Sequence, residues 1–407
     1  MKGFLSVPIR LTLWLASILS IVFVINSCHR FDEKPFVTVG NLPEKSLIDT
    51  AFNRLFDQQI LENIAIHECP GMAVLVLKNN QVIFEKEYGT KSRYSDDMID
   101  TSTIFRLGSV SKGFAGILAA ILIDKNMMHL DDPVSMYVPE ITLKAKSKDK
   151  ILRIKHILTH SSGLTQHAYS NLVDENIDME TIISYLNKLV PRDSTGIAYA
   201  YQNAAFGIIE KVIEDVTGME YAKALDFYIF SPLRMCNTSC SFEDITSAAN
   251  VCYGHKYSKY GFVPIDLSPH YYNVVSAGGI NAPLKDMHKW LSAMMGYYPH
   301  VISPNARDIA FNPYISTSSD HKYFNRWPGF ESSHYGLGWR IVNTKNNQLV
   351  YHGGMVNGFR TEIAFDKEKD LGIVILFNSV CNYSNYAVHK FYDLWNSYYK
   401  TEKEAYL

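Results

Sequence analysis

The sequence predicts an α+β fold: one antiparallel sheet flanked by helices, with a large, mostly helical insertion between its first and last strands. Two runs with strand character lie together at residues 71–90, and about four more lie between 335 and 379. The segment from about 109 to 300 instead shows apolar residues at helical spacing and long loops. A single sheet completed across this insertion accounts for both groups of strands.

Each element has its own signal in the sequence. Residues 46–66 and 385–399 carry apolar side chains at helical spacing, so helices near both ends can cover the sheet. The runs GMAVLVLKNN and QVIFEKEYGT meet at Asn79-Asn80 and predict a β-hairpin. The later strands, separated by turn-forming residues, are expected at 335–342, 348–354, 359–366 and 371–379.

The composition is that of an ordinary globular protein. The 407 residues are 47% hydrophobic and 20% charged, with a formal net charge of −2. Long runs of like charge are missing from the sequence, so we expect no nucleic acid or acidic polymer as partner. The length suits one large domain or two ordinary ones. Because the sequence has no repeat and no low-complexity linker, we expect residues 46–400 to form a single domain.

The N-terminal segment differs from the rest. Lys2 and Arg10 precede an uncharged stretch, Leu11–Ile25. As a helix this stretch would be roughly 22 Å long, too short for a hydrocarbon core of about 30 Å. We therefore expect residues 1–27 to be a secretory signal peptide.

The end of this segment, VINSC, resembles a bacterial lipoprotein signal, with Ile25, the small Ser27, and Cys28 as the acylated first residue of the mature chain. Asn26 is an unusual occupant of the middle position, so an ordinary signal peptide or an uncleaved anchor stays open. Residues 28–45 would form a tether. Each version exports the domain to the cell envelope or periplasm, and a lipid on the cysteine would hold it at a membrane.

Cysteine and histidine spacing predicts neither a disulfide scaffold nor a metal site. If Cys28 carries lipid, five of the six cysteines remain, so one bridge is possible in an oxidising compartment, but the sequence does not choose the pair. Cys236-x3-Cys240 lacks a second pair of ligands nearby. His156-x3-His160 lacks the glutamate that zinc peptidases require. We expect no metal and no cofactor.

The strongest candidate for chemistry is Ser109-Val-Ser-Lys112. Residues three apart share a helix face, so Lys112 can reach the Ser109 hydroxyl. A serine at a helix N-terminus has a backbone N–H ready for an oxyanion. The apolar stretch that follows predicts a buried helix, and burial favours a neutral amine able to accept the serine proton. On spacing alone, a capping serine and a lysine that reaches solvent stay open.

Two further motifs can complete such a site. Tyr201-Gln-Asn203 opens directly onto the amphipathic stretch AAFGIIEKVIEDVTG, a junction that can expose a side chain and hold it rigidly. His352-Gly353-Gly354 ends a predicted strand, where glycines let a substrate backbone approach the strand edge. Taken singly, Tyr201 could be one more buried tyrosine, and a lone histidine such as His352 is more often structural than catalytic.

Together, FRLGSVSKGFAG, YAYQNAAFGIIEKVIEDVTG and YHGGMVNGFRTEIAFDKEKDLGIVILFN resemble the penicillin-recognising serine hydrolases, which include class C β-lactamases, low-molecular-weight D-alanyl-D-alanine carboxypeptidases and related esterases. The segments LRIKHILTHSSGL and SAGGINAPLKDMHKWL resemble further landmarks of that family, in the same order. The resemblance covers about residues 46–395 and implies a β-lactamase/transpeptidase-like fold.

The resemblance implies a role for each matched residue. Ser109 would attack a carbonyl and form an acyl-enzyme, while Lys112 and Tyr201 would share the proton transfers. The remaining positions would bind substrate: Asn203 through its amide, His352, Gly353 and Gly354 along the strand edge, and Met355, together with Ser109, through the backbone N–H groups of an oxyanion hole.

His-Gly-Gly departs from the Lys-Thr/Ser-Gly of the β-lactamases proper. A histidine with an ordinary pKa of about 6.5 is mostly neutral at pH 7, and a threonine hydroxyl is missing, so two donors for a substrate carboxylate are weakened or lost. We therefore expect a D-alanyl carboxypeptidase or an esterase acting on small peptides or esters, with cell-wall material as a candidate substrate and β-lactams as candidate ligands. A class C-type β-lactamase and a non-catalytic penicillin-binding or sensing lipoprotein remain alternatives.

Overall fold

The computed structural model describes residues 49–143, 151–317 and 321–405. These described residues belong to one compact unit. The predicted signal peptide, the acylation site Cys28 and the tether lie outside the described residues, so these expectations stay predictions. Within the described ranges, no helix is both long enough and apolar enough to cross a bilayer.

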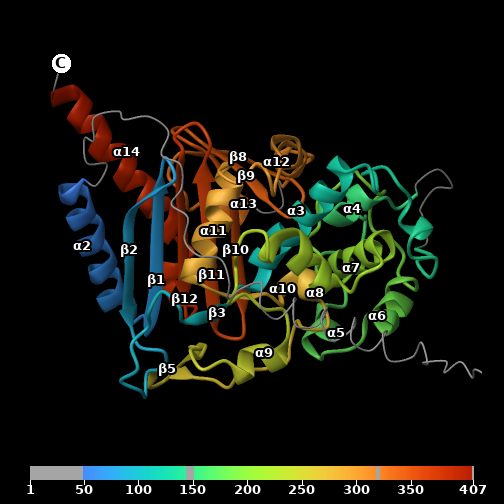
Figure 1. Cartoon of the computed structure of the whole chain (residues 1–407), viewed down its shortest axis with the longest axis horizontal. Helices are drawn as coiled ribbons and strands as arrows, with labels where there is room; N and C mark the ends of the chain where they lie inside the picture. Colours follow the sequence, from blue (N-terminus) through green and yellow to red (C-terminus); the bar gives the residue numbers. More distant parts are fainter. Residues whose placement is uncertain (1–48, 144–150, 318–320, 406–407) are drawn as a thin grey trace, which may run out of the picture. The chain divides into compact units, whose positions relative to one another are not determined.

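The framework of the described chain is an antiparallel sheet of eight strands (Figure 1). Its strands are β1 (Gly71–Lys78), β2 (Gln81–Gly89), β7 (Ile315–Ser316), β8 (Phe330–Tyr335), β9 (Arg340–Thr344), β10 (Gln348–Val356), β11 (Phe359–Asp366) and β12 (Leu371–Phe377). Two short pairs lie outside it, β3 (Ile104–Arg106) with β6 (Asn281–Pro283) and β4 (His255–Ser258) with β5 (Gly261–Pro264).

The order of the large sheet is β2-β1-β12-β11-β10-β9-β8-β7. The first strands of the chain therefore join the last strands through the antiparallel β1–β12 pair, and helices fill the chain between them. The predicted α+β fold, with one sheet completed across a helical insertion, is confirmed.

The helices account for most of the insertion and for both ends of the described chain. The α-helices are α2 (Thr50–His67), α3 (Ser111–Asp124), α4 (Ile154–Leu158), α5 (Ser170–Asp174), α6 (Met179–Leu186), α7 (Asn203–Thr217), α8 (Tyr221–Leu225), α9 (Phe242–Ser247), α10 (Val275–Gly278), α11 (Leu284–Met295), α12 (Pro304–Phe311), α13 (His321–Phe324) and α14 (Ala387–Ala405). The short helical turns are η1 (Gly108–Val110), η2 (Val134–Met136), η3 (Asp226–Phe230) and η5 (Asn382–Asn385).

Central strand β12 shows how the core is divided. Ile373 and Ile375 point to one face, where they pack with apolar residues of α2 and α14. Val374 and Leu376 point to the other face, where α11 covers the sheet. Figure 1 shows α2 and α14 on one side of the sheet and α11 on the other. The strand is buried on both faces, which explains its unbroken apolar sequence.

Two hairpins follow from local backbone preference. Asn79 and Asn80 join β1 to β2 with φ of 50° and 59°, and Asn357 and Gly358 join β10 to β11 with φ of 45° and 76°. Positive φ at both central positions is the type I′ turn that suits the twist of paired strands. The first of these turns is the one that the sequence predicted.

The predicted strand at 335–342 is wrong in its first half. The chain leaves β8 at Gly336–Trp339 and re-enters the sheet only at Arg340, so β7 and β8 are additional strands that the sequence did not predict. Gly338 has a φ of 72°, and a Cβ there would lie 2.0 Å from the carbonyl oxygen of Lys112. This glycine-rich loop packs directly on helix α3, which its apolar, strand-like composition does not reveal.

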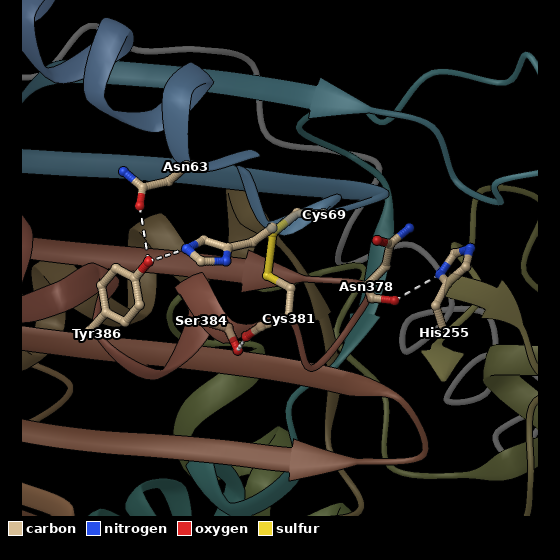
Figure 2. The surroundings of a disulfide bond; sticks show 8 residues. Asn63, Cys69, His255, Asn378, Cys381, Ser384 and Tyr386 are labelled. Carbon is tan, nitrogen blue, oxygen red and sulfur yellow. Dashed lines mark hydrogen bonds between the residues drawn. A yellow bond between two sulfur atoms is a disulfide. The ribbon is translucent and has the colours of Figure 1, made fainter. Parts of the chain in front are cut away.

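A disulfide between Cys69 and Cys381 closes the far ends of the described chain on each other (Figure 2). It joins the residues after α2 to those after β12, across a sequence separation of 312. Beside it, the Tyr386 hydroxyl donates to Asn63 Oδ1 at 3.0 Å and contacts His67. The sequence left this pairing open, because nothing local relates the two cysteines.

Replacing both bridged cysteines with serine should lower the melting temperature. The bridge closes a very long loop, so its loss should cost roughly 3–5 kcal/mol, or about 5–10 °C. Thermal unfolding with and without a reductant measures this. The reductant should lower the Tm of the wild-type protein and leave the double variant unchanged; equal Tm values for the oxidised wild type and the variant would contradict the prediction.

Candidate active site

The candidate nucleophile lies where sheet and insertion meet. Ser109 sits in the 3-10 turn η1, directly before α3, and is partly exposed. Lys112 occupies the first turn of α3 and is completely buried. The Lys112 Nζ atom lies 3.3 Å from Ser109 Oγ. An accessible hydroxyl therefore faces a buried amine, and this lysine does not reach solvent.

The surroundings of the Lys112 amine favour its neutral form. Nζ donates to Asn203 Oδ1 and to the carbonyl oxygen of Ala277, both at 2.8 Å. A neutral amine has two N–H groups and one lone pair, so two carbonyl acceptors leave the lone pair for the Ser109 hydroxyl. Burial, reinforced by the charge of Arg340, holds the pKa of Lys112 well below its ordinary value of 10.5. The amine can accept the serine proton.

Tyr201 lies beside this pair. Its ring centroid is 4.8 Å from the Lys112 Nζ atom and 4.3 Å from the ring of His160. The Arg340 guanidinium carbon lies 5.7 Å from the same centroid. Because Tyr201 is partly exposed, a molecule bound at Ser109 can meet it. The Ser109–Lys112 pair and Tyr201, from two segments far apart in sequence, thus gather at one place.

Asn203 serves the amine as well as any substrate. Its Oδ1 accepts from Lys112, and its Nδ2 donates to the hydroxyl of Tyr271 at 3.0 Å. The side chain is 7% exposed. An amide nitrogen carries two N–H groups, so one donor remains for the substrate contact that the resemblance implied.

The side chain of His352 is buried and interacts with other groups of the protein. The side chain is 1% exposed, its Nε2 lies 2.9 Å from the Tyr335 hydroxyl, and its Nδ1 lies 2.9 Å from the carbonyl oxygen of Gly353. Burial, followed by the charge of Arg340, lowers the pKa of His352 well below 6.5. The imidazole is neutral at pH 7, and both ring nitrogens face groups of the protein, so the strand backbone is what this position offers a substrate.

Two glycines bring β10 into backbone contact with the nucleophile turn. A Cβ on Gly354 would lie 1.9 Å from the carbonyl oxygen of Leu107 and 3.0 Å from the Ser109 nitrogen. Gly108, with a φ of 52°, would place a Cβ 2.7 Å from the Met355 nitrogen. No side chain fits between these segments. The amides of residues 109 and 355 are therefore held close together.

The backbone of Met355 faces an open strand edge. Val356 and Phe359 flank the two-residue β10–β11 turn, and successive residues of an antiparallel pair direct their N–H groups alternately toward and away from the partner. Met355 precedes the hydrogen-bonded pair, so its N–H points away from β11. Strand β9 pairs with β10 only as far as Tyr351, which leaves that edge free of β9. The two amides can bind one oxyanion.

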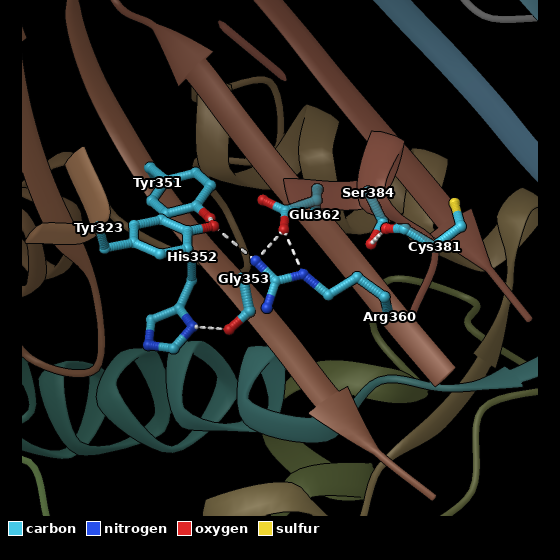
Figure 3. Close-up of polar contacts among 8 residues, drawn as sticks. All are labelled: Tyr323, Tyr351, His352, Gly353, Arg360, Glu362, Cys381 and Ser384. Carbon is cyan, nitrogen blue, oxygen red and sulfur yellow. Dashed lines mark hydrogen bonds and ion pairs between the residues drawn. The ribbon is translucent and has the colours of Figure 1, made fainter. Parts of the chain in front are cut away.

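Gly353 faces the opposite side of the strand, against a buried polar network (Figure 3). A Cβ there would lie 2.8 Å from Arg360 Nη2 and 3.0 Å from Glu362 Oε1. Arg360 forms an ion pair with Glu362 and donates to the Tyr323 hydroxyl, which lies 2.7 Å from that of Tyr351. Packing on both faces of β10 therefore requires glycine at the last two positions of His-Gly-Gly.

Sequence reasoning missed the charged and aromatic residues around the amine. The Arg340 guanidinium carbon lies 5.6 Å from the ring centroid of Tyr335, and its charge contributes to the lowered pKa values of Lys112, His160 and His352. Neither a motif nor a spacing relates Arg340 to the matched segments. Its only signal is its position directly after the loop that packs on α3.

The two histidines of His156-x3-His160 accept hydrogen bonds from the backbone. His156 Nδ1 accepts from the backbone N–H of Arg153, and His160 Nδ1 accepts from that of Gln202. Among the described residues, no group of three or more potential ligands is arranged to hold a metal ion. A surface groove of about 790 Å³ beside Lys369 contains none of the site residues. The candidate site is therefore defined by the distances among Ser109, Lys112 and Tyr201.

Comparisons with known proteins agree with this geometry. A family profile described as Beta-lactamase matches residues 56–392. The unguisins hydrolase of Aspergillus campestris is 25% identical over 348 residues, which cover 82% of this chain but only 62% of that protein. A beta-lactamase of Yersinia enterocolitica is 24% identical over 386 residues, covering 86% of this chain and 93% of that one.

A solved structure shows the same fold. The octameric penicillin-binding protein homologue from Pyrococcus abyssi superposes with a TM-score of 0.73 and 24% sequence identity, over 84% of this chain and 76% of the other. At this identity the likeness concerns the fold.

Substituting Gly354→Ala should impair the site without unfolding the protein. The new Cβ would meet backbone atoms, so β10 must shift relative to the nucleophile turn, and a displacement of about 1 Å can reduce rates by about a hundredfold. Labelling of Ser109 by a fluorophosphonate measures this. Gly372→Ala is the matched control, because its Cβ would meet only side-chain atoms of Met295 and Leu291; equal labelling rates for the two variants would contradict the prediction.

The same labelling should depend on pH through Lys112. Only the neutral amine accepts a proton, so the rate should fall as the pH drops through a lysine pKa that lies well below 10.5. Replacing Arg340 with glutamine removes a positive charge that disfavours the ammonium, so the pKa should rise and the acidic limb should move to higher pH. A limb that stays in place or moves to lower pH would contradict this electrostatic role.

Proposed function

The chain belongs to the beta-lactamase family of serine hydrolases, and from that premise we propose that Ser109 forms an acyl-enzyme with small peptide or ester substrates, in the manner of a D-alanyl carboxypeptidase or esterase. The observation that carries the proposal is the buried Lys112 amine, whose Nζ lies 3.3 Å from the Ser109 hydroxyl and 2.8 Å from each of two carbonyl oxygens. In its neutral form, the two N–H groups bind those carbonyl oxygens and the lone pair can accept the Ser109 proton.

Each group then has one task in the reaction. As Ser109 Oγ bonds to the substrate carbonyl carbon, its proton passes to Lys112 Nζ. The backbone N–H groups of Ser109 and Met355 stabilise the oxyanion of the tetrahedral intermediate. The Tyr201 hydroxyl relays the proton from the amine to the leaving group, which departs as the acyl-enzyme forms. Water then attacks the acyl carbon, loses its proton along the same path, and Ser109 regains its own.

The proposed substrate class follows from the charges at the site. His352 is neutral and buried, so β10 presents no ammonium to a substrate carboxylate, unlike the strand of β-lactamases proper. Arg340 supplies a cation beside Tyr201 instead. Peptides that end in a free carboxylate fit this charge better than neutral esters do. Cell-wall peptides ending in D-alanine are therefore our first candidates.

The same arginine favours one alternative, a β-lactamase, because β-lactam antibiotics carry a carboxylate too. The name of the Yersinia relative supports this candidate, and that of the Aspergillus relative supports a hydrolase. A purely non-catalytic binding protein is disfavoured, because it has no use for a neutral buried lysine beside an accessible serine.

We further propose that the protein works outside the cytoplasm, exported by residues 1–27 and held at a membrane through Cys28. The Cys69–Cys381 disulfide supports export, since such bridges persist in oxidising compartments. Intact-mass analysis of protein purified from membranes tests the anchor: it should show a diacylglyceryl adduct that disappears in Cys28→Ala.

Exposure to a penicillin should add one antibiotic mass to the wild-type protein and none to Ser109→Ala. Ser111→Ala is the matched control, because Ser111 lies in the same helical segment but accepts a hydrogen bond from the Ile280 N–H; it should still be labelled. Intact-mass spectrometry measures the adduct, and equal labelling of the wild type and Ser109→Ala would end the proposal.

Nitrocefin separates the two catalytic candidates in the same protein. Stoichiometric acylation with slow turnover, together with release of D-alanine from a D-Ala-D-Ala peptide, supports the peptidase. Rapid continuous hydrolysis of nitrocefin without peptide cleavage supports the β-lactamase.

A further inference from the structure

The two oxygen atoms that hold Lys112 as an amine come from different helices. Asn203 is the first residue of α7, and Ala277 lies in α10. Helix α10 has only four residues, too few to be stable by itself. The geometry at Nζ therefore depends on whatever fixes α10 relative to α7.

One side chain makes that connection directly. Glu210 lies on α7, seven residues after Asn203 and thus on nearly the same face. Its Oε1 accepts a hydrogen bond of 2.7 Å from the backbone N–H of Ser276, the residue before Ala277. This N–H belongs to the first turn of α10 and has no acceptor within its own helix. The contact ties the two helices one residue away from the carbonyl that binds Lys112.

We propose that Glu210 is a positioning residue: by accepting the Ser276 N–H it fixes α10 against α7 and so places the two carbonyl oxygens that keep Lys112 a neutral amine facing Ser109. The inference rests on the proposed function, because it concerns the amine that activates the nucleophile. It adds a residue that touches neither substrate nor reacting atoms and that the proposed mechanism does not use.

The surroundings of Glu210 support a specific task. The Glu210 side chain is only partly exposed, and burial of its carboxyl group raises the pKa of that group to about 7. Glu214 adds to this rise and Lys211, on the same helix, opposes it, while Tyr221 on α8 and the thiol of Cys240 are the other titratable groups that interact with it. Such a group destabilises the fold when it ionises, so simple packing would be better served by an apolar residue.

The test compares Glu210→Ala, Glu210→Gln and Glu214→Ala for the pH dependence of Ser109 acylation. Removing the acceptor should loosen α10 and let water reach the amine, so the pKa of Lys112 should rise. We expect the alanine variant to move the acidic limb to higher pH and to lower the rate at pH 7 about tenfold. The glutamine variant keeps an acceptor oxygen and should stay within about twofold of the wild type.

Glu214→Ala is the matched control. Glu214 lies one turn further along α7 and also accepts a backbone N–H, at 3.1 Å, but from Tyr221 at the start of α8. Its loss should leave the acidic limb in place. The inference is overturned if Glu210→Ala leaves the limb unmoved, if Glu210→Gln moves it as far, or if Glu214→Ala moves it equally.

Hydrogen exchange tests the role of Glu210 independently of the proposed function. Amides of residues 275–280 should exchange faster in Glu210→Ala than in the wild type, and at the wild-type rate in Glu210→Gln. If the wild type is never acylated, the proposed function fails, while unchanged exchange in Glu210→Ala overturns the connection itself. Glu210→Asp, with a side chain shorter by one CH2, has the same expected direction and replaces the alanine variant if that does not fold.

Discussion

The burial of one amine is the constraint on which the site depends. In the described chain, the hydrogen-bonding neighbours of Lys112 Nζ are oxygen atoms of Ser109, Asn203 and Ala277, and none is a carboxylate. A buried ammonium without a counter-charge is costly, so burial lowers the pKa of Lys112 and favours the neutral form. That neutral form is the one that can take a proton from an alcohol.

Glycines allow the nucleophile segment to be enclosed by other backbone. Gly354 and Gly108 let the backbone of β10 contact the turn of Ser109, and Gly338 lets the loop before β9 contact the backbone of α3 at Lys112. The segment is therefore held from two sides by close main-chain packing, which positions a serine more rigidly than side-chain contacts alone. The position of β10 in the sheet therefore also fixes the position of Ser109.

Successive side chains of β10 point to opposite faces of the sheet, and each face meets different groups. His352 and Gly354 face the amine, while Tyr351 and Gly353 face the Arg360–Glu362 ion pair. With His352 neutral, the positive charge next to the amine comes from β9, through Arg340. This shift of charge from one strand to its neighbour is the physical basis for proposing carboxylate-bearing substrates despite the missing lysine.

The sequence by itself determined what depends on short-range geometry. The Asn79-Asn80 turn, the helical periods and the three-residue spacing of Ser109 and Lys112 are all local, so pattern and spacing predict them. Only the tertiary structure decided the break after β8, the pairing of Cys69 with Cys381, and the contacts of Lys112 with acceptors 91 and 165 residues away. Partners so distant in the chain leave no periodic signal, because chain folding alone brings them together.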